Sequence, residues 1–233
     1  GQPEGLVLVR APLEVQQLVD ESGLAAVVYG TPYLSVNHLS FVDADQRAIG
    51  QLLTEHALAK GASQILVVMR DRMLPGDSPY LDAVHGAVAR AGLAADRIRI
   101  RFLARDRELV AAEVRDLLGS CRNKASEIPV SNSPQSPPLP AILCRDEPLA
   151  DLVLGEVEGQ RLTPGKDLVV AVSTIYRRGN EDPPPIPFTQ YAESPIQIGE
   201  HLGRLLVSRA DRKPSRSRES KILPVTLCLG RER

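Results

Sequence analysis

The sequence predicts an α/β protein with parallel β-sheet, and three observations lead to this fold class. Short apolar runs alternate along the chain with longer segments in which apolar residues recur at helical spacing. The runs are continuous, as in the Leu-Val-Leu-Val of 6–9, which is typical of buried parallel strands. Glycines follow helical segments, for example Gly23, Gly61 and Gly92. This order predicts right-handed βαβ units, with helices covering the sheet.

The first half of the chain contains the strongest helical pattern. It covers 46–60, where apolar residues and His56 share one face and Gly61 follows the last turn. The other helical segments end at a glycine or begin after a polar turn. The predicted strands here are 6–9, 25–29, 39–42, 65–69 and 98–103, and the predicted helices are 12–22, 46–60, 79–91 and 106–118.

The second half of the chain carries two segments with loop composition. The segment 123–140 is rich in Ser and Pro, and 176–187 contains three consecutive prolines. Apolar runs and helical patterns occupy the remainder. The predicted strands are 141–144, 168–172 and 223–229, and the predicted helices are 147–160 and 195–208.

The composition excludes several classes of function. Lys and Arg number 28 against 29 Asp and Glu, so no bulk attraction to DNA or to anionic membranes is expected. No apolar run reaches the roughly 18 residues of a membrane span. The chain has no Trp and 3% aromatic residues, which disfavours stacking platforms for nucleic acids or sugars. Three widely spaced cysteines favour a reducing compartment over a disulfide framework.

No arrangement of residues predicts catalysis, a metal site or a cofactor. The glycines around Lys166 lack the spacing of a phosphate loop, and no histidine lies at metal-ligand spacing from a cysteine. Asp43 and Asp45 form a carboxylate pair at a strand end, where capping of the next helix explains them more simply. Packing against the core likewise explains His56.

The alternation of elements predicts where a ligand would bind before its chemistry is known. In open parallel sheets, ligands bind beyond the carboxyl ends of the strands. That edge comprises the loops after Val9, Tyr29, Met69, Cys144 and Val172.

Six strings, in order across nearly the whole chain, resemble the effector-binding domain of the LacI/GalR transcriptional regulators. They are Phe-Val-Asp at 41–43 with the helix 46–60 and the apolar run 64–68, the helix 80–93, Pro-Ala-Ile-Leu-Cys-Arg-Asp at 140–146, Leu-Thr-Pro-Gly-Lys-Asp-Leu-Val-Val at 162–170, Pro-Phe-Thr-Gln-Tyr at 187–191 and Ile-Leu-Pro-Val-Thr-Leu at 222–227.

The resemblance implies a periplasmic-binding-protein-like fold of type I. This fold has two similar lobes of doubly wound parallel sheet, with the ligand cleft between them. The N-terminal lobe is expected at 1–42 and 187–211, and the C-terminal lobe at 43–186 and 212–233. The family has two further strand–helix units and a helix-turn-helix before the segment that matches 6–9. We therefore expect the sequence to be part of a longer chain.

The resemblance also implies the site residues. Tyr80, Arg145 and Thr174 match family positions that bind sugar hydroxyls, although all three residue types differ from the family pattern. An anionic effector met by Arg145 and by Arg177 or Arg178 is one interpretation. The other is that these arginines lie on the surface and the pocket binds nothing. The full set of predicted ligand-binding residues is Arg10, Tyr29, Tyr80, Arg145, Thr174 and Glu193.

The predicted function is non-enzymatic sensing by a cytoplasmic transcriptional regulator. A small-molecule effector, sugar-like or anionic, would change DNA binding by a helix-turn-helix elsewhere in the protein, and dimerisation is expected from two-fold half-site recognition. No membrane contact is expected. A solute-binding protein of the periplasmic type is the alternative, because it shares the two-lobe architecture. An α/β enzyme is compatible with the fold but lacks a supporting set of residues.

Overall fold

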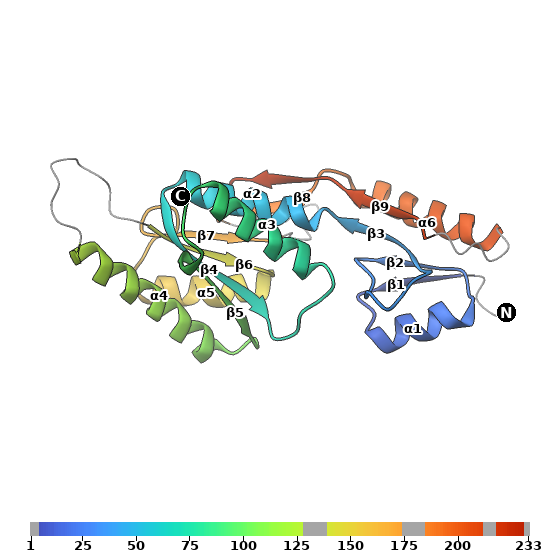
Figure 1. Cartoon of the computed structure of the whole chain (residues 1–233), viewed down its shortest axis with the longest axis horizontal. Helices are drawn as coiled ribbons and strands as arrows, with labels where there is room; N and C mark the ends of the chain where they lie inside the picture. The colour runs from blue at the N-terminus through green and yellow to red at the C-terminus, as the bar shows by residue number, and fades with distance from the viewer. Residues whose placement is uncertain (1–4, 128–138, 174–184, 212–217, 231–233) are drawn as a thin grey trace. The chain divides into compact units, whose positions relative to one another are not determined.

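The chain folds into an alternating series of helices and strands, as Figure 1 shows. The structure is a computed structural model that describes residues 5–127, 139–173, 185–211 and 218–230. In chain order the elements are β1 (Leu6–Val9), α1 (Leu13–Ser22), β2 (Ala26–Tyr29), β3 (Ser40–Ala44), α2 (Gln46–Ala59), β4 (Ala62–Arg70), α3 (Asp77–Arg90), the 3₁₀ turn η1 (Ala95–Arg97), β5 (Ile98–Leu103), α4 (Arg107–Glu127), β6 (Leu139–Cys144), α5 (Glu147–Gly159), β7 (Val169–Val172), β8 (Phe188–Tyr191), α6 (Pro195–Asp211), β9 (Ser220–Leu223) and β10 (Val225–Cys228).

These elements form two compact units, each built on its own sheet. Unit 1 comprises Gly1–Ala48, Leu74–Pro79 and Tyr191–Val225, and unit 2 comprises Ile49–Met73, Tyr80–Gln190 and Thr226–Arg233. The strand order is β1-β2-β3-β9 in the first sheet and β10-β8-β7-β6-β4-β5 in the second. The predicted α/β class with parallel sheets is confirmed, because the neighbouring strands pair in parallel register throughout the residues described above: β1–β2, β2–β3 and β3–β9 in one sheet, and β4–β5, β4–β6, β6–β7 and β7–β8 in the other.

The sheet of unit 1 is covered on both faces. The helix α1 contributes Leu13 and Val19 to a cluster with Ala26 and Val28 of β2. The helix α6 packs along β1, β2 and β3, and its Ile198 joins Val42 and Leu223 in a second cluster. The apolar residues of α1 and α6 therefore form the two halves of this core.

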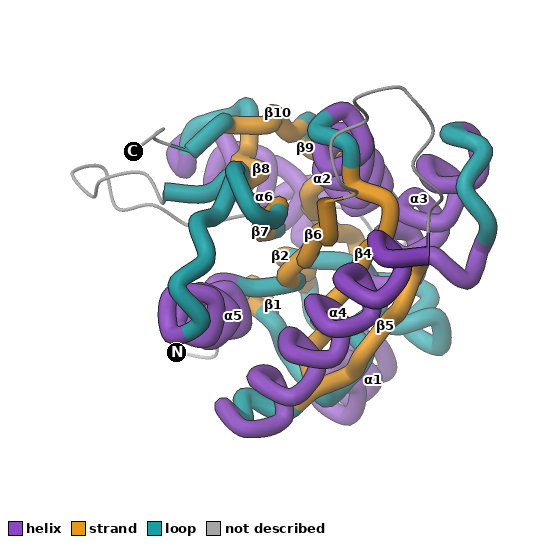
Figure 2. Tube along the Cα trace, turned by 90° about the vertical axis from the view of Figure 1, so that its left-hand side faces the viewer, coloured by secondary structure: helices purple, strands orange, loops and turns teal. Residues whose placement is uncertain are grey.

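The sheet of unit 2 has the larger core, because its central strands are buried on both faces. Figure 2 shows its strands in succession from β10 to β5. The helices α4 and α5 cover one face, where Val114 and Val153 pack against Leu66 and Ile142. The helices α2 and α3 lie on the opposite face of these strands in Figure 1, and their Ile49, Leu53 and Val84 are fully buried.

Three predicted segments differ from the structure. The helix predicted to end at Leu118 continues through Gly119, because one helical glycine costs only about 1 kcal/mol and Ser120 and Cys121 bond to the Gln64 side chain. The four-residue strand β8 lies between the predicted loop 176–187 and the predicted helix 195–208, where no strand was predicted because the segment has no alternating apolar pattern.

The predicted terminal strand 223–229 is instead two strands in different sheets. Pro224 interrupts it, because proline has no N–H for a sheet ladder. β9 pairs with β3 in the first sheet, whereas β10 neighbours β8 in the second. The predicted lobes grouped 212–233 with the second lobe, and the strand pairing divides that segment between the two sheets. Similarly, β8 of the predicted first lobe pairs with β7 of the second sheet.

Candidate functional site

The polar residues of unit 2 collect where its parallel strands end. The register of the sheet pairs Val68 of β4 with Cys144 of β6, and Cys144 with Val172 of β7. Arg70, Arg145 and Ser173 therefore follow at the same edge of the sheet. This is the edge at which the sequence predicts ligand binding.

Arg145 is a buried arginine at this edge of the sheet. Only 8% of it is exposed, and its Cζ lies 4.7 Å from the centroid of the Tyr80 ring. Tyr80 is fully buried on α3, so its ring serves as the surface on which the guanidinium stacks. The backbone N–H of Arg145 donates to the carbonyl of Val68 at 2.9 Å, which continues the ladder beyond β6. The structure thus brings two predicted site residues, Tyr80 and Arg145, into direct contact.

Ser173 lies next to Arg145 across the sheet. Its backbone N–H donates to the carbonyl of Cys144 at 2.9 Å, directly beyond the Cys144–Val172 pair. The residue is 1% exposed, and its hydroxyl has no hydrogen-bond partner within the described ranges. A buried hydroxyl in this state costs free energy, so this atom is a candidate contact for a bound molecule.

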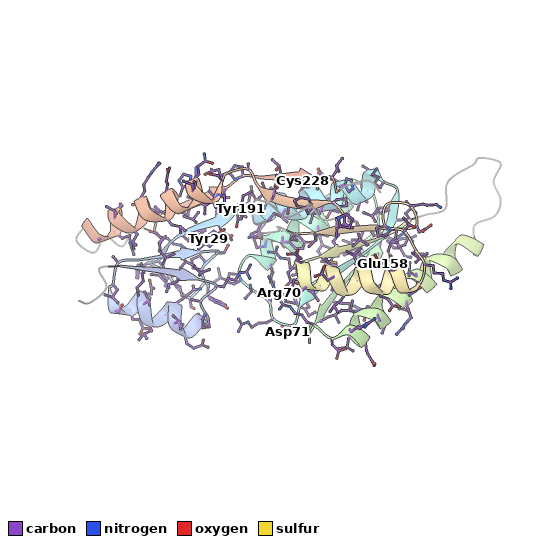
Figure 3. The ribbon with its side chains drawn as sticks, turned by 180° about the vertical axis from the view of Figure 1, so that it is seen from behind. Tyr29, Arg70, Asp71, Glu158, Tyr191 and Cys228 are labelled. Carbon is purple, nitrogen blue, oxygen red and sulfur yellow. The ribbon has the colours of Figure 1, made fainter. Side chains whose placement is uncertain are left out.

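An Arg-Asp dipeptide follows each of three neighbouring strands. The dipeptides are Arg70-Asp71 at the end of β4, Arg105-Asp106 after β5 and Arg145-Asp146 after β6. Figure 3 shows Arg70 and Asp71 together at this end of the unit 2 strands.

Two of the three aspartates have structural roles. Asp106 accepts from the backbone N–H groups of Glu108 and Leu109, and Asp146 accepts from that of Leu149. These bonds cap the N-termini of α4 and α5. Asp146 also accepts from the Arg105 side chain at 3.3 Å. The carboxylates of Asp106 and Asp146 thus act as N-caps of α4 and α5.

The predicted site residues of unit 1 lie at the ends of its own strands. The register pairs Val9 with Tyr29, so Arg10 follows directly beyond this pair. Arg10 is exposed and has a φ of 49°, which is uncommon for a residue other than glycine. The Tyr29 ring lies 6.5 Å from that of Tyr191, and Figure 3 labels both.

Glu193, the remaining predicted residue of unit 1, contacts two side chains. His201 Nε2 lies 2.6 Å from Glu193 Oε2, and Lys221 Nζ lies 4.0 Å from Oε1. Glu193 therefore has partners within unit 1.

Three predicted residues lie outside the described ranges. They are Thr174, Arg177 and Arg178.

The sequence reasoning missed Arg70, Ser173 and Tyr191 as neighbours of the predicted residues. The repeated Arg-Asp dipeptide after successive apolar runs was the available signal for Arg70. Ser173 directly follows a predicted strand, but only the register shows that it lies beside Arg145. Tyr191 ends a strand that was not predicted from the sequence.

The other candidate groups have structural roles. Asp45 accepts from the Ala48 N–H at 2.8 Å and caps α2, while Asp43 accepts from Thr31 at 2.5 Å and from the Gln46 side chain at 3.0 Å. Partial burial, together with Lys60, lowers the pKa of His56 on α2. In the part of the chain that the structure describes, no three His, Cys, Asp or Glu side chains group to hold a metal ion. Nor does any helix there have the length and apolarity needed to cross a membrane.

Comparison with known proteins gives structural matches only. No protein-family model and no curated protein matches the sequence. The probable maltose operon repressor MalR of Staphylococcus aureus superimposes with a TM-score of 0.74 at 15% identity, covering 97% of this chain and 74% of that one. The fold is that of LacI-family regulators.

Two further structures with the LacI-family fold contain a sugar. A LacI family regulator of Enterococcus faecium with bound ribose gives a TM-score of 0.70 at 15% identity, covering 97% of this chain and 78% of that one. The regulator CelR in complex with cellobiose gives 0.72 at 17% identity, covering 98% of this chain and 65% of that one. The predicted periplasmic-binding-protein-like fold is therefore confirmed.

Proposed function

We propose that this chain is the effector-binding and dimerisation domain of a LacI-type transcriptional regulator. The observation that carries the proposal is the structural match to such regulators, which extends over 97% of this chain. The polar edge of unit 2 supports it, because a buried arginine, a tyrosine ring and a buried hydroxyl gather where parallel-sheet proteins bind ligands.

In this proposal the domain works by binding and catalyses no reaction. The cysteine at this edge is not suited to nucleophilic catalysis. Burial and the carboxylates of Asp146 and Asp151 raise the pKa of the Cys144 thiol far above the ordinary range. A thiol in that state is a poor nucleophile. The proposed effector acts instead by favouring one arrangement of the two units over another, which changes the affinity of a DNA-reading segment elsewhere in the protein.

The proposed partners follow from this mechanism. The effector is a small molecule, sugar-like or anionic, since ribose and cellobiose occupy two structures of the same fold. DNA contact is assigned to a helix-turn-helix outside this chain. Two-fold operators require two such readers, so the proposal includes a homodimer acting in the cytoplasm.

A ligand screen by thermal shift tests the proposal. Sugars, sugar phosphates and nucleobases form the panel, and at least one compound is expected to raise the Tm in a saturable manner. Sedimentation of the unliganded chain, run in parallel, is expected to show a dimer. A monomer would remove the dimerisation role, and a panel without any saturable shift would contradict effector binding.

A further inference from the structure

The two polar side chains at the ends of β6 and β7 face the same way. Side chains on parallel strands alternate between faces, and paired residues share a face. Arg145 and Ser173 each directly follow a residue of the pair Cys144–Val172. Both therefore lie on the face opposite Cys144, which is the face of α3 and Tyr80. The guanidinium of Arg145 and the hydroxyl of Ser173 thus lie on the same face of the sheet, at the ends of neighbouring strands.

The Tyr80 ring bounds the arginine on one side, with Cζ 4.7 Å from the ring centroid. A guanidinium is planar and carries its N–H donors in a fixed fork. Two such donors in one plane match the two oxygens of a carboxylate or phosphate. Ser173 adds one further donor beside them, and its hydroxyl has no partner among the described residues.

The neighbouring strand also ends in an arginine, on the face of Cys144. Arg70 ends β4, the strand adjacent to β6, and Figure 3 shows it at the end of the sheet. The Asp of the Arg145-Asp146 dipeptide is turned to the N-terminus of α5 and to Arg105. The acidic residue beside Arg145 in sequence thus has its own partners.

We infer that the ligand carries an oxyanion group, a carboxylate or a phosphate, which binds to Arg145 and Ser173. This inference rests on the proposed effector-binding function and specifies its ligand class. It assigns Arg145 to the charged group and Tyr80 to the support of Arg145. A neutral sugar satisfies a fork of charged donors less well than an oxyanion does.

Calorimetric titration with matched ligands tests the inference. The probes are inorganic phosphate and two sets that each pair a neutral sugar with charged derivatives, namely ribose with ribose 5-phosphate, and glucose with glucose 6-phosphate and gluconate. We expect phosphate and at least one charged sugar to bind, the charged sugar about tenfold or more tightly than its neutral counterpart. Arg145→Gln is expected to abolish that preference.

Further variants distinguish ligand contact from structural damage. Ser173→Ala keeps the fold and is expected to weaken charged ligands by about threefold to tenfold. Arg90→Gln, an exposed arginine on the same helix as Tyr80, serves as the matched control and is expected to bind as the wild type does. Circular dichroism checks that each variant is folded. If Arg145→Gln does not fold, Ser173→Ala provides the same comparison.

The outcomes separate this inference from the proposed function. A neutral sugar that binds as tightly as its charged counterpart overturns the anionic ligand and leaves effector binding intact. Charged ligands that bind equally to Arg145→Gln and to the wild type also overturn it. If neither charged nor neutral probes bind, the inference is overturned, and a failure of the wider screen would then remove the proposed function as well.

Discussion

Two consecutive residues at the end of β6, Cys144 and Arg145, have very different surroundings. Arg145 is 8% exposed, and its guanidinium lies over the Tyr80 ring, a favourable cation–π contact. Cys144, the preceding residue, lies on the opposite face and is fully buried among apolar side chains of α4, α5 and the sheet. Adjacent residues of one strand thus meet different surroundings, because successive side chains point to opposite faces.

The surroundings of Cys144 predict its reactivity. Burial and the nearby carboxylates of Asp146 and Asp151 raise the pKa of this thiol, so it stays protonated at neutral and mildly alkaline pH. We expect iodoacetamide to modify the half-buried Cys228 in the native protein and to reach Cys144 only after unfolding. Mass spectrometry of peptides from native and urea-unfolded samples measures this. Equal native labelling of both residues would contradict the burial described here.

The packing of α2 against α3 depends on a close approach of the two helix backbones at Gly50. Gly50 on α2 faces α3, where a Cβ at position 50 would lie 2.4 Å from the Tyr80 carbonyl oxygen. This glycine lets α3 approach α2 closely, and α3 in turn carries the ring that supports Arg145. The packing of two helices is thereby linked to the polar edge.

Gly50→Ala is therefore expected to destabilise the protein by about 1–3 kcal/mol, because the added methyl group meets backbone that cannot move alone. The matched control is Gly119→Ala on α4, where a Cβ would meet nothing within 4 Å. There the same change is expected to stabilise the protein by about 0.5–1 kcal/mol through helix propensity. Urea unfolding monitored by circular dichroism measures both. Opposite signs support the close approach, and equal effects at the two positions would refute it.

Local patterns in the sequence predicted most of the elements correctly. The helix at 46–60 and the buried strands were predictable because hydrophobic spacing and glycine caps are local features. The segment around Pro224 was not, because the pairing of β9 with β3 joins parts of the chain that are far apart in sequence. The family resemblance predicted Arg145 and Tyr80 as site residues. The position of Ser173 beside Arg145 and the contact of Arg145 with the Tyr80 ring required the tertiary structure.

The molecule consists of two units, and its chain passes between them repeatedly. Leu74–Pro79 and Tyr191–Val225 belong to unit 1, although they follow segments of unit 2. Neither unit is a continuous stretch of chain, so each depends on segments that enter from the other. The same fold occurs in regulators with bound ribose and cellobiose. The central claim is that this chain binds a small molecule through the polar strand-end edge of unit 2.

Amide hydrogen exchange with and without ligand tests this claim most directly. The ligand is the panel compound that raises the Tm most, added at saturation. We expect amide exchange to slow at the strand ends of unit 2, in 68–73, 144–149 and 171–173. The slowing there should exceed the uniform slowing that ligand-induced stabilisation causes in the rest of the chain. Slower exchange that spares these three segments, or a panel in which no compound alters exchange at all, would contradict it.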